Sequence, residues 1–256
     1  MKSIRSFATA SRRVPGFTLL ELLVSVLIIA VLATLIFTGF RKWVNMSAQA
    51  VCSNNLRMLA TATNLYLGDN NNFYPPYVKK SANGKMWFFG EETSAPGVAE
   101  GDRELNKEAG PLYPYIEQVG KIEVCRGFNY GSALWKAKFK GASYGYGYNW
   151  ILGGRTTGKP LNAAQLTGPS VILFGDCGQV NTFQAPASAA KPMIEEFYII
   201  NEKDKTVHFR HGGSANILFV DGHVESFKPY PGTVDMRMKG EVVGRITKAG
   251  SMEYLR

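Results

Sequence analysis

Cysteine is scarce in this chain, and its three cysteines, Cys52, Cys125 and Cys177, are far apart. No two of them have C-x-x-C spacing, which argues against zinc ribbons and dithiol redox motifs. Charged residues are also few, at 19%, and they form no clustered basic stripe of the kind that binds nucleic acid. A phosphate loop and a dinucleotide fingerprint are both absent. The sequence therefore predicts no cofactor and no specific nucleic-acid partner.

The longest stretch that lacks charge is residues 17–40, where Glu21 is the single ionisable side chain. At about 1.5 Å rise per residue, about 24 residues of helix measure about 36 Å, enough to cross a bilayer core of about 30 Å. A carboxylate inside hydrocarbon costs about 3 kcal/mol and is usually paired and functional. The simpler alternative for Glu21 is an acid tolerated near the membrane edge.

The residues before this stretch are basic, with Lys2, Arg5, Arg12 and Arg13 and no acid. Basic flanks stay in the cytoplasm, so the rest of the chain is expected on the far side of the membrane. An ordinary secretory signal is disfavoured, because the apolar run exceeds 7–15 residues and no A-x-A site follows it. We predict a single-pass protein whose N-terminus is cytoplasmic.

Residues 16–21, Gly-Phe-Thr-Leu-Leu-Glu, resemble the signature of type IV pilins and type II secretion pseudopilins. The resemblance implies that a membrane peptidase of the bacterial inner membrane cuts between Gly16 and Phe17 and methylates the new amino terminus. It also implies that the Glu21 carboxylate meets the terminal amine of a neighbouring subunit during assembly. Many pilins have a proline near the end of the transmembrane half, where this chain has Thr38-Gly39.

The apolar helix is predicted to continue beyond the membrane. Residues 41–67 contain no proline or glycine. A stripe of residues recurs there every three or four positions, as in an amphipathic helix with one buried face: Val44, Ala48, Cys52, Leu56, Leu59, Thr63 and Tyr66. The glycine and asparagine run at 68–72 ends it. We therefore divide the chain into a leader (1–16), a transmembrane helix (17–40), its amphipathic continuation (41–68) and a head (69–256).

The head is predicted to be mostly loops and short strands. Trp87, Phe88 and Phe89 are expected to form a buried patch, and Lys136–Lys140 a solvated face. The alternating tyrosines and glycines of 144–150 are expected to pack on the helix rather than bind a sugar or a surface. Further elements are a short helix at 112–119, strands at 170–174 and 195–200, and an edge strand around Val242-Val243.

A hairpin is predicted at residues 215–227, with Asp221-Gly222 as a two-residue type I′ turn. That turn would place Val220 opposite His223 and Phe219 opposite Val224. One face would then point inward, with Ile217, Phe219, Val224 and Ser226 on it. The other face would carry Asn216, Leu218, Val220, His223, Glu225 and Phe227.

Nine residues separate His211 from Asp221-Gly222, an arrangement similar to the C-terminal signature of pilin-like proteins abundant in planctomycete and verrucomicrobial relatives. Other landmarks also resemble that group: Cys52–Leu56, Tyr66 to Asn70, Ser143 to Gly145 with Asn149, and Gly175-Asp176. Cys125-Arg126 departs from the group, which usually has Cys-Pro there.

Several side chains of the head could carry chemistry. Asp176, His208, His211, Asp221 and His223 offer ligand atoms for a structural divalent cation, for which pseudopilin heads provide a precedent by resemblance. A pair of His211 with Asp176 that holds the hairpin is the simpler hypothesis, and we favour it. Ser214 with His211 and Asp221 lacks a nucleophile-elbow context, so a hydrolytic site is disfavoured. One disulfide is expected among three pairings.

Together these patterns predict an α+β pilin-like fold, in which a long N-terminal helix packs against an antiparallel sheet. The predicted function is that of a non-enzymatic pilin or pseudopilin, with no cofactor. Its expected partners are the prepilin peptidase/methyltransferase, other pilin or pseudopilin subunits, and the inner membrane. The alternative is a membrane-anchored periplasmic enzyme or binding domain in which Glu21 is incidental.

Overall fold

The computed structural model describes residues 16–255 apart from 94–96, 123, 126, 142, 156–157 and 167, and it gives no side-chain positions for 37–45. Residues 1–15 of the predicted leader therefore lie outside the described residues. The same holds for Arg126, one of the two residues at which the chain departs from the resembling group. The chain divides into two compact units, Met1–Val44 and Asn45–Arg256. Each unit is described by itself below.

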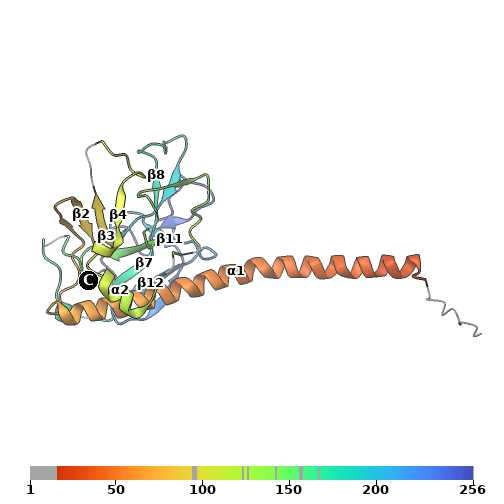
Figure 1. Cartoon of the computed structure of the whole chain (residues 1–256), viewed down its shortest axis with the longest axis horizontal. Helices are drawn as coiled ribbons and strands as arrows, with labels where there is room; N and C mark the ends of the chain where they lie inside the picture. The colour runs from red at the N-terminus through yellow and green to blue at the C-terminus, as the bar shows by residue number, and fades with distance from the viewer. Residues whose placement is uncertain are drawn as a thin grey trace, which may run out of the picture. The chain divides into compact units, whose positions relative to one another are not determined.

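One helix, α1 (Leu19–Asp69), begins in the first unit and ends in the second (Figure 1). Its 51 residues confirm the prediction of an uninterrupted helix, which follows from the lack of a breaking residue between Arg41 and Leu67. In the second unit its buried face matches the predicted stripe: Ala48, Cys52, Leu56, Leu59, Thr63 and Tyr66. Asn71 and Asn72, both with positive φ, follow the end of the helix.

The central sheet of the second unit has the strand order β10-β6-β7-β12-β13. Its strands are β6 (Tyr146–Asn149), β7 (Ile172–Asp176), β10 (Ile199–Ile200), β12 (Ala215–Phe219) and β13 (Val224–Phe227). All neighbours are antiparallel except β10 and β6, which are parallel. The fold is therefore α+β as predicted, with a mixed rather than purely antiparallel sheet.

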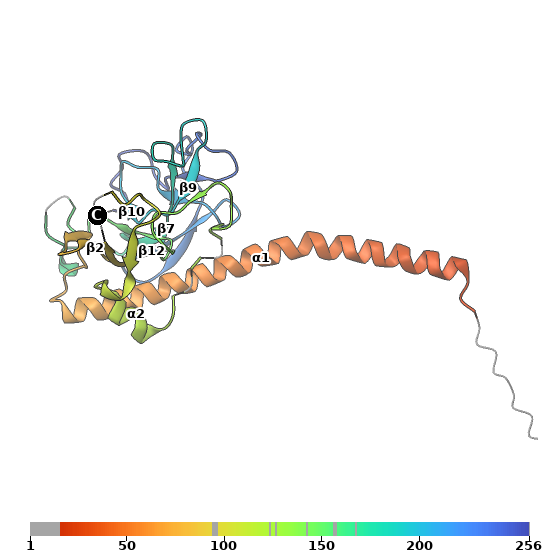
Figure 2. The same cartoon turned by 45° about the horizontal axis from the view of Figure 1, so that its top comes forward.

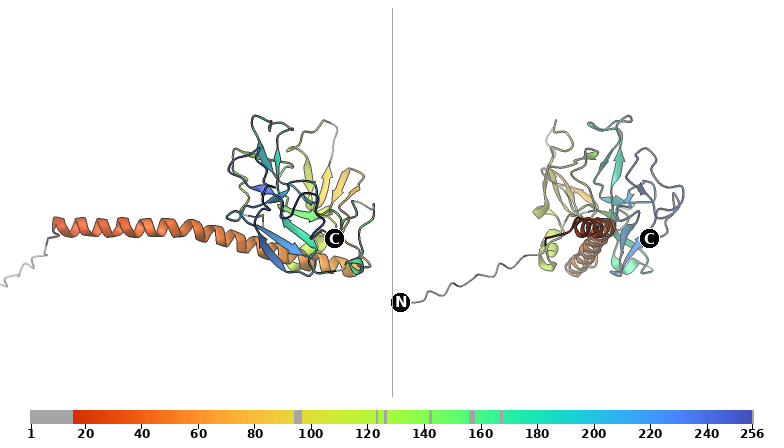
Figure 3. Two further views of the ribbon diagram at one scale, coloured as in Figure 1. Left: turned by 180° about the vertical axis from the view of Figure 1, so that it is seen from behind. Right: turned by 90° about the vertical axis from the view of Figure 1, so that its right-hand side faces the viewer.

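Smaller sheets surround the central one. The first has the order β1-β2-β3-β4: β1 (Val78–Lys80), β2 (Gly84–Trp87), β3 (Gly90–Thr93), β4 (Glu104–Asn106). The second has the order β5-β9-β8: β5 (Trp135–Lys136), β9 (Met193–Glu195), β8 (Gln179–Asn181). The third pairs β11 (Val207–His208) with β14 (Val243–Gly244), which confirms a strand at the predicted C-terminal position. Figure 3 shows the yellow strands β1–β4 and the blue C-terminal segments on different sides of this unit.

The described residues of this unit also form three short helices: α2 (Tyr113–Val119), η1 (Lys107–Ala109) and η2 (Ala163–Gln165). Helix α2 lies beside the last turns of α1 (Figure 2). The rings of Tyr66 and Tyr115 meet edge to face, with their centroids 5.6 Å apart. The position of α2 confirms the short helix predicted over 112–119.

The C-terminal half of α1 packs on one face of the central sheet. Cys52, Leu56 and Leu59 share a buried cluster with Tyr146 and Leu218. Asn55 Nδ2 also donates to the Tyr146 hydroxyl at 2.9 Å. The tyrosine- and glycine-rich strand therefore packs on the helix, as predicted. Trp87, Phe88 and Phe89 belong to the same cluster and are buried, which confirms the predicted patch.

The opposite face of the sheet is covered by the chain's own C-terminal half, and Ile172, Ile217 and Phe219 pack there with Val207 and Leu255. Both faces of β12 are therefore buried, and all five of its residues are inaccessible. A strand that is covered on both sides needs no polar face, so the residues of β12 do not alternate between buried and exposed.

The hairpin β12–β13 forms, but its predicted register is wrong by one residue. Leu218 pairs with Val224, and Phe219 N donates to His223 O at 3.0 Å across a three-residue loop. Among residues 219–223, all of them described, only Gly222 has a positive φ, whereas a type I′ turn needs two such residues. The loop has the geometry in which a left-handed glycine forms a bulge.

This shift exchanges the faces of β13, because side chains alternate along a strand. Val224 now shares the face of Leu218 and packs with the α1 cluster, rather than with Ile217 and Phe219 as predicted. Ser226 lies opposite Asn216 on the same side, where Gln49 Nε2 contacts both of their side-chain oxygens.

The basic run at Lys136–Lys140 is also not the predicted solvated face. Lys136 and Lys138 are buried, and their ammonium groups lie 2.8 and 3.4 Å from the carboxylate of Glu195. Lys136 also pairs with Glu100 at 2.8 Å. Only Lys140, paired with Glu104 at the surface, follows the expectation. The three lysines at alternate positions of the run therefore pair with acids that are distant in the sequence.

Candidate functional site

The start of α1 holds the residues of the predicted processing and assembly site. Gly16 and Phe17 are exposed and precede the helix. Thr18 occupies the N-cap position: its hydroxyl accepts from Glu21 N at 3.2 Å, while its backbone N–H and hydroxyl both donate to Glu21 Oε2, at 2.9 and 2.8 Å. This reciprocal pair is a capping box, which satisfies amide groups that the first helical turn leaves without partners. The Glu21 carboxylate therefore lies one residue from the amide of Phe17.

Beyond this cap the helix presents apolar side chains on all sides. Leu19–Ile36 is long and apolar enough to cross a membrane, and none of it is buried within the protein. Such a surface needs lipid or other apolar helices around it. Glu21 is the only charged side chain in this segment.

A second cluster surrounds Asp176, which is fully buried at the end of β7. Arg210 Nη2 donates to Oδ1 at 2.7 Å, and Asn216 N donates to Oδ2 at 2.7 Å. His211 Nε2 lies 3.2 Å from Oδ2, so the predicted pairing of His211 with Asp176 is present. Burial opposes ionisation of this carboxyl, but Arg210, His211 and the Asn216 amide outweigh it and lower the pKa of Asp176.

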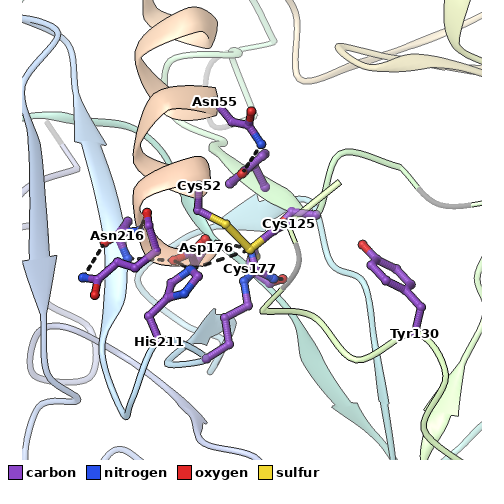
Figure 4. The surroundings of a disulfide bond; sticks show 12 residues. Cys52, Asn55, Cys125, Tyr130, Asp176, Cys177, His211 and Asn216 are labelled. Atoms are coloured by element: carbon purple, nitrogen blue, oxygen red, sulfur yellow. Dashed lines mark hydrogen bonds and ion pairs between the residues drawn. A yellow bond between two sulfur atoms is a disulfide. The ribbon is translucent and has the colours of Figure 1, made fainter. Parts of the chain in front are cut away.

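A disulfide between Cys52 and Cys125 lies against the same histidine (Figure 4). It joins α1 to the segment after α2, and Cys125 Sγ lies 3.6 Å from His211 Nε2. The sequence alone left three pairings open, and this is the one that forms. Cys177 keeps a buried free thiol, which donates to Ile199 O at 3.3 Å, and burial raises its pKa to about 12.

The cluster thus ties together α1, β7 and the hairpin. His211 and Asn216 lie at the start of β12. The side-chain amide of Asn216 accepts from Gln49 Nε2 on α1 and donates to Gln49 O, both at 3.3 Å. Arg210 extends the network to backbone oxygens of Gly145 and Cys177. The His211 end of the predicted His-x9-Asp-Gly signature therefore acts in head packing.

The other end of that signature lies elsewhere. Asp221 and His223 are at the hairpin tip, where Asp221 Oδ1 accepts from His223 N at 3.0 Å and contacts ring Nδ1 at 2.6 Å. The five residues of β12, about 17 Å of extended chain, separate this tip from His211. The five predicted metal candidates therefore do not converge: Asp176 lies with His211, Asp221 with His223, and His208 with Glu241. The disfavoured set of Ser214, His211 and Asp221 is divided in the same way.

Comparison with known proteins matches residues 11–37 to the model described as the prokaryotic N-terminal methylation motif. The chain carries a prepilin-type methylation motif. Motifs of this kind are typical of type IV pilin-like proteins that serve as prepilin peptidase substrates. No curated protein and no solved structure matches the chain. The similarity of the His211–Gly222 signature to other pilin-like chains stays a prediction.

The motif coincides with the exposed glycine, the capping box and the apolar helix described above. An apolar helix next to a prepilin-type motif indicates membrane anchoring through this segment. The sequence predicted this site from Gly16, Phe17 and Glu21. It missed the capping role of Thr18, for which the spacing Thr-x-x-Glu was the available signal.

The sequence also failed to predict two contributions to the cluster that surrounds Asp176. The position of Arg210, adjacent to His211, gave no sign that its guanidinium turns inward to Asp176. The pairing of Cys52 with Cys125 depends on the fold, because the two residues are separated by 73 positions.

The third histidine of the predicted metal set, His208, gives a pH prediction. It is buried, its Nε2 contacts Glu241 at 2.9 Å, and its Nδ1 has no hydrogen-bond partner among the described residues. Burial lowers the pKa of His208 from its usual 6.5, although Glu241 opposes this. Because the pKa of His208 is lower in the folded chain, the unfolded chain binds more protons at this ring as the pH drops below 6.5. The free energy of unfolding therefore falls as the pH drops.

We therefore expect the free energy of unfolding to fall by up to about 1.4 kcal/mol per pH unit through this group as the pH drops below 6.5. In His208→Gln that part of the slope should vanish, as measured by urea unfolding of the detergent-solubilised chain. An unchanged slope in His208→Gln would show that its ring does titrate in the folded state.

Proposed function

We propose that the chain is a pilin or pseudopilin: a structural subunit processed after Gly16, methylated at the Phe17 amine and assembled into a filament through α1. The observation that supports this most directly is the position of Glu21. Glu21 is the only charged side chain of the apolar segment Leu19–Ile36, and it lies in the first turn of α1. It stands four residues after Phe17, the residue that cleavage would expose.

The physical reason for assembly is that the Glu21 carboxylate and the Phe17 amine are both unfavourable in an apolar environment when unpaired. A carboxylate and a terminal amine each cost several kcal/mol in an apolar environment, and a close pair offsets much of that cost. Pairing Glu21 of one subunit with the Phe17 amine of the next sets the axial stagger between helices. The apolar surface of Leu19–Ile36 can face lipid before assembly and other α1 helices afterwards.

The proposed partners follow from this route. They are a prepilin peptidase/methyltransferase, further pilin or pseudopilin subunits, and the bacterial inner membrane, with the basic leader on the cytoplasmic side and the head in the periplasm. The work is mechanical, and the proposal needs no cofactor and no catalytic residue.

The test of this function is cleavage by a prepilin peptidase co-expressed with the chain. Wild-type chain should lose residues 1–16, whereas Gly16→Val should remain almost entirely uncleaved. A branched side chain at Gly16 would keep the backbone from approaching the catalytic groups closely. Intact-mass measurement distinguishes the two forms. Ser25→Ala, farther along the same helix, should be cleaved like wild type. Cleavage of Gly16→Val at the wild-type rate, or a cut elsewhere, would contradict the proposal.

A further inference from the structure

The head contains four potential metal-ligand side chains in one buried place. Ligand atoms of Cys52, Cys125, Asp176 and His211 all lie within 4.8 Å of one another, and all four residues are buried. They come from α1, the segment after α2, the end of β7 and the entry to β12. Figure 4 shows the His211 ring directed at both the Asp176 carboxylate and the Cys125 sulfur. In the disulfide state the sulfurs are joined to each other and are not thiolate ligands.

Two separations within this group are those of a tetrahedral zinc site. Zn–S bonds of about 2.3 Å and Zn–N or Zn–O bonds of about 2.0 Å place neighbouring S and N ligands about 3.5 Å apart, and N and O ligands about 3.3 Å apart. Cys125 Sγ lies 3.6 Å from His211 Nε2, and Asp176 Oδ2 lies 3.2 Å from the same nitrogen. Two of the edges of the tetrahedron therefore exist already, and after reduction the two sulfurs need to separate by side-chain rotation.

The charge of the cluster also suits a divalent cation. Asp176 and Arg210 cancel each other in the disulfide state, and both are fully buried. Two thiolates would add two uncompensated negative charges, which a single Zn²⁺ neutralises while His211 stays neutral. Outer contacts that orient the carboxylate are already present, since Arg210 holds Oδ1 and the Asn216 amide holds Oδ2.

We propose that the thiol form of this chain binds one Zn²⁺ through Cys52, Cys125, Asp176 and His211. On binding, each thiol loses one proton and two Zn–S bonds form. A disulfide oxidant then accepts two electrons from the two thiolates, the Cys52–Cys125 bond forms, the oxidant becomes a dithiol after taking up two protons, and Zn²⁺ is released. Zinc and disulfide thus serve alternately as the link between α1 and the head. The site is independent of cleavage at Gly16.

The experiment uses the detergent-solubilised full chain, reduced with a phosphine, freed of metal and titrated with Zn²⁺ against a chromophoric chelator. Co²⁺ serves as a spectroscopic probe, because tetrahedral thiolate coordination gives intense visible absorption and a thiolate-to-metal charge-transfer band. We expect one metal per reduced chain, with both Co²⁺ features, and at least about 100-fold weaker binding by the oxidised chain, which lacks thiolate ligands. Equal affinity of the two redox forms, or a reduced, folded chain that binds no Zn²⁺, would overturn the proposal.

Variants separate this site from the third thiol. Loss of an outer contact alone costs about 10- to 100-fold in metal affinity, so His211→Ala and Asp176→Asn should each weaken Zn²⁺ binding by at least about tenfold. Two variants are used so that a folding defect in one, checked by circular dichroism, leaves the other to decide. Cys177→Ser should keep wild-type stoichiometry and Co²⁺ absorption. Loss of binding in Cys177→Ser, with retention in both ligand variants, would assign the metal to a different place.

Discussion

Glu21→Ala is expected to leave the chain inserted and cleaved but to lower its incorporation into filaments by about 100-fold. An unpaired charge in an apolar environment costs about 3 kcal/mol, and each 1.4 kcal/mol corresponds to a factor of ten. In the variant the Phe17 amine of the neighbouring subunit would have no partner. The measurement is the amount of the chain in sheared or purified filaments relative to the amount in the membrane.

Glu21 also caps α1 through Thr18, so a second variant is needed to separate charge from capping. Glu21→Gln keeps an oxygen that can accept from Thr18 but carries no charge. The charge-pairing mechanism predicts that Glu21→Gln fails like Glu21→Ala, whereas a purely capping role predicts near-normal incorporation. Ser25→Ala, on the same helix, controls for changes of apolar packing. Normal incorporation of Glu21→Ala would favour the membrane-anchored enzyme or binding domain considered from the sequence.

Asp176→Ala should destabilise the head by about 3–5 kcal/mol, because removing one partner of a buried ion pair leaves the other charge uncompensated. Here that charge is the Arg210 guanidinium, whose side chain is 1% exposed. The variant also removes the acceptor of the Asn216 amide and the contact with His211. Urea unfolding followed by tryptophan fluorescence measures the effect in the detergent-solubilised chain.

The chain offers a matched control at the hairpin tip. Asp221 pairs with His223 at 2.6 Å, but both side chains are more than one-third exposed. Exposed ion pairs contribute about 0–1 kcal/mol, so Asp221→Ala should cost about 1 kcal/mol or less. Equal losses for the two aspartates would refute the interpretation of Asp176 as the centre of head packing.

The sequence was most informative where local patterns decide structure. The 51-residue helix follows from an apolar run, a three- and four-residue stripe and the absence of breakers between Arg41 and Leu67. The stripe residues from Ala48 to Tyr66 are buried as predicted, although Asn55, Ala60, Ala62 and Leu67 of α1 are buried as well. The alternating residues at 144–150 were correctly expected to pack on this helix. Gly16, Phe17 and Glu21 fall within the matched methylation motif, whereas their roles in cleavage and assembly stay predictions.

Features that depend on distant residues could not be predicted. The Asp-Gly pair indicated a hairpin, but the bond from Phe219 N to His223 O, rather than a two-residue turn, sets the register. Likewise, Lys136 and Lys138 looked solvated because Glu195 is more than fifty positions away along the chain. The Cys52–Cys125 bond and the inward Arg210 depend on tertiary packing in the same way.

The most direct test of the account is the intact mass and N-terminal sequence of the protein purified from its own host membranes. The account predicts a chain that begins at N-methylated Phe17 and lacks residues 1–16. A chain that still begins at Met1, or one cut beyond the apolar helix, would contradict it.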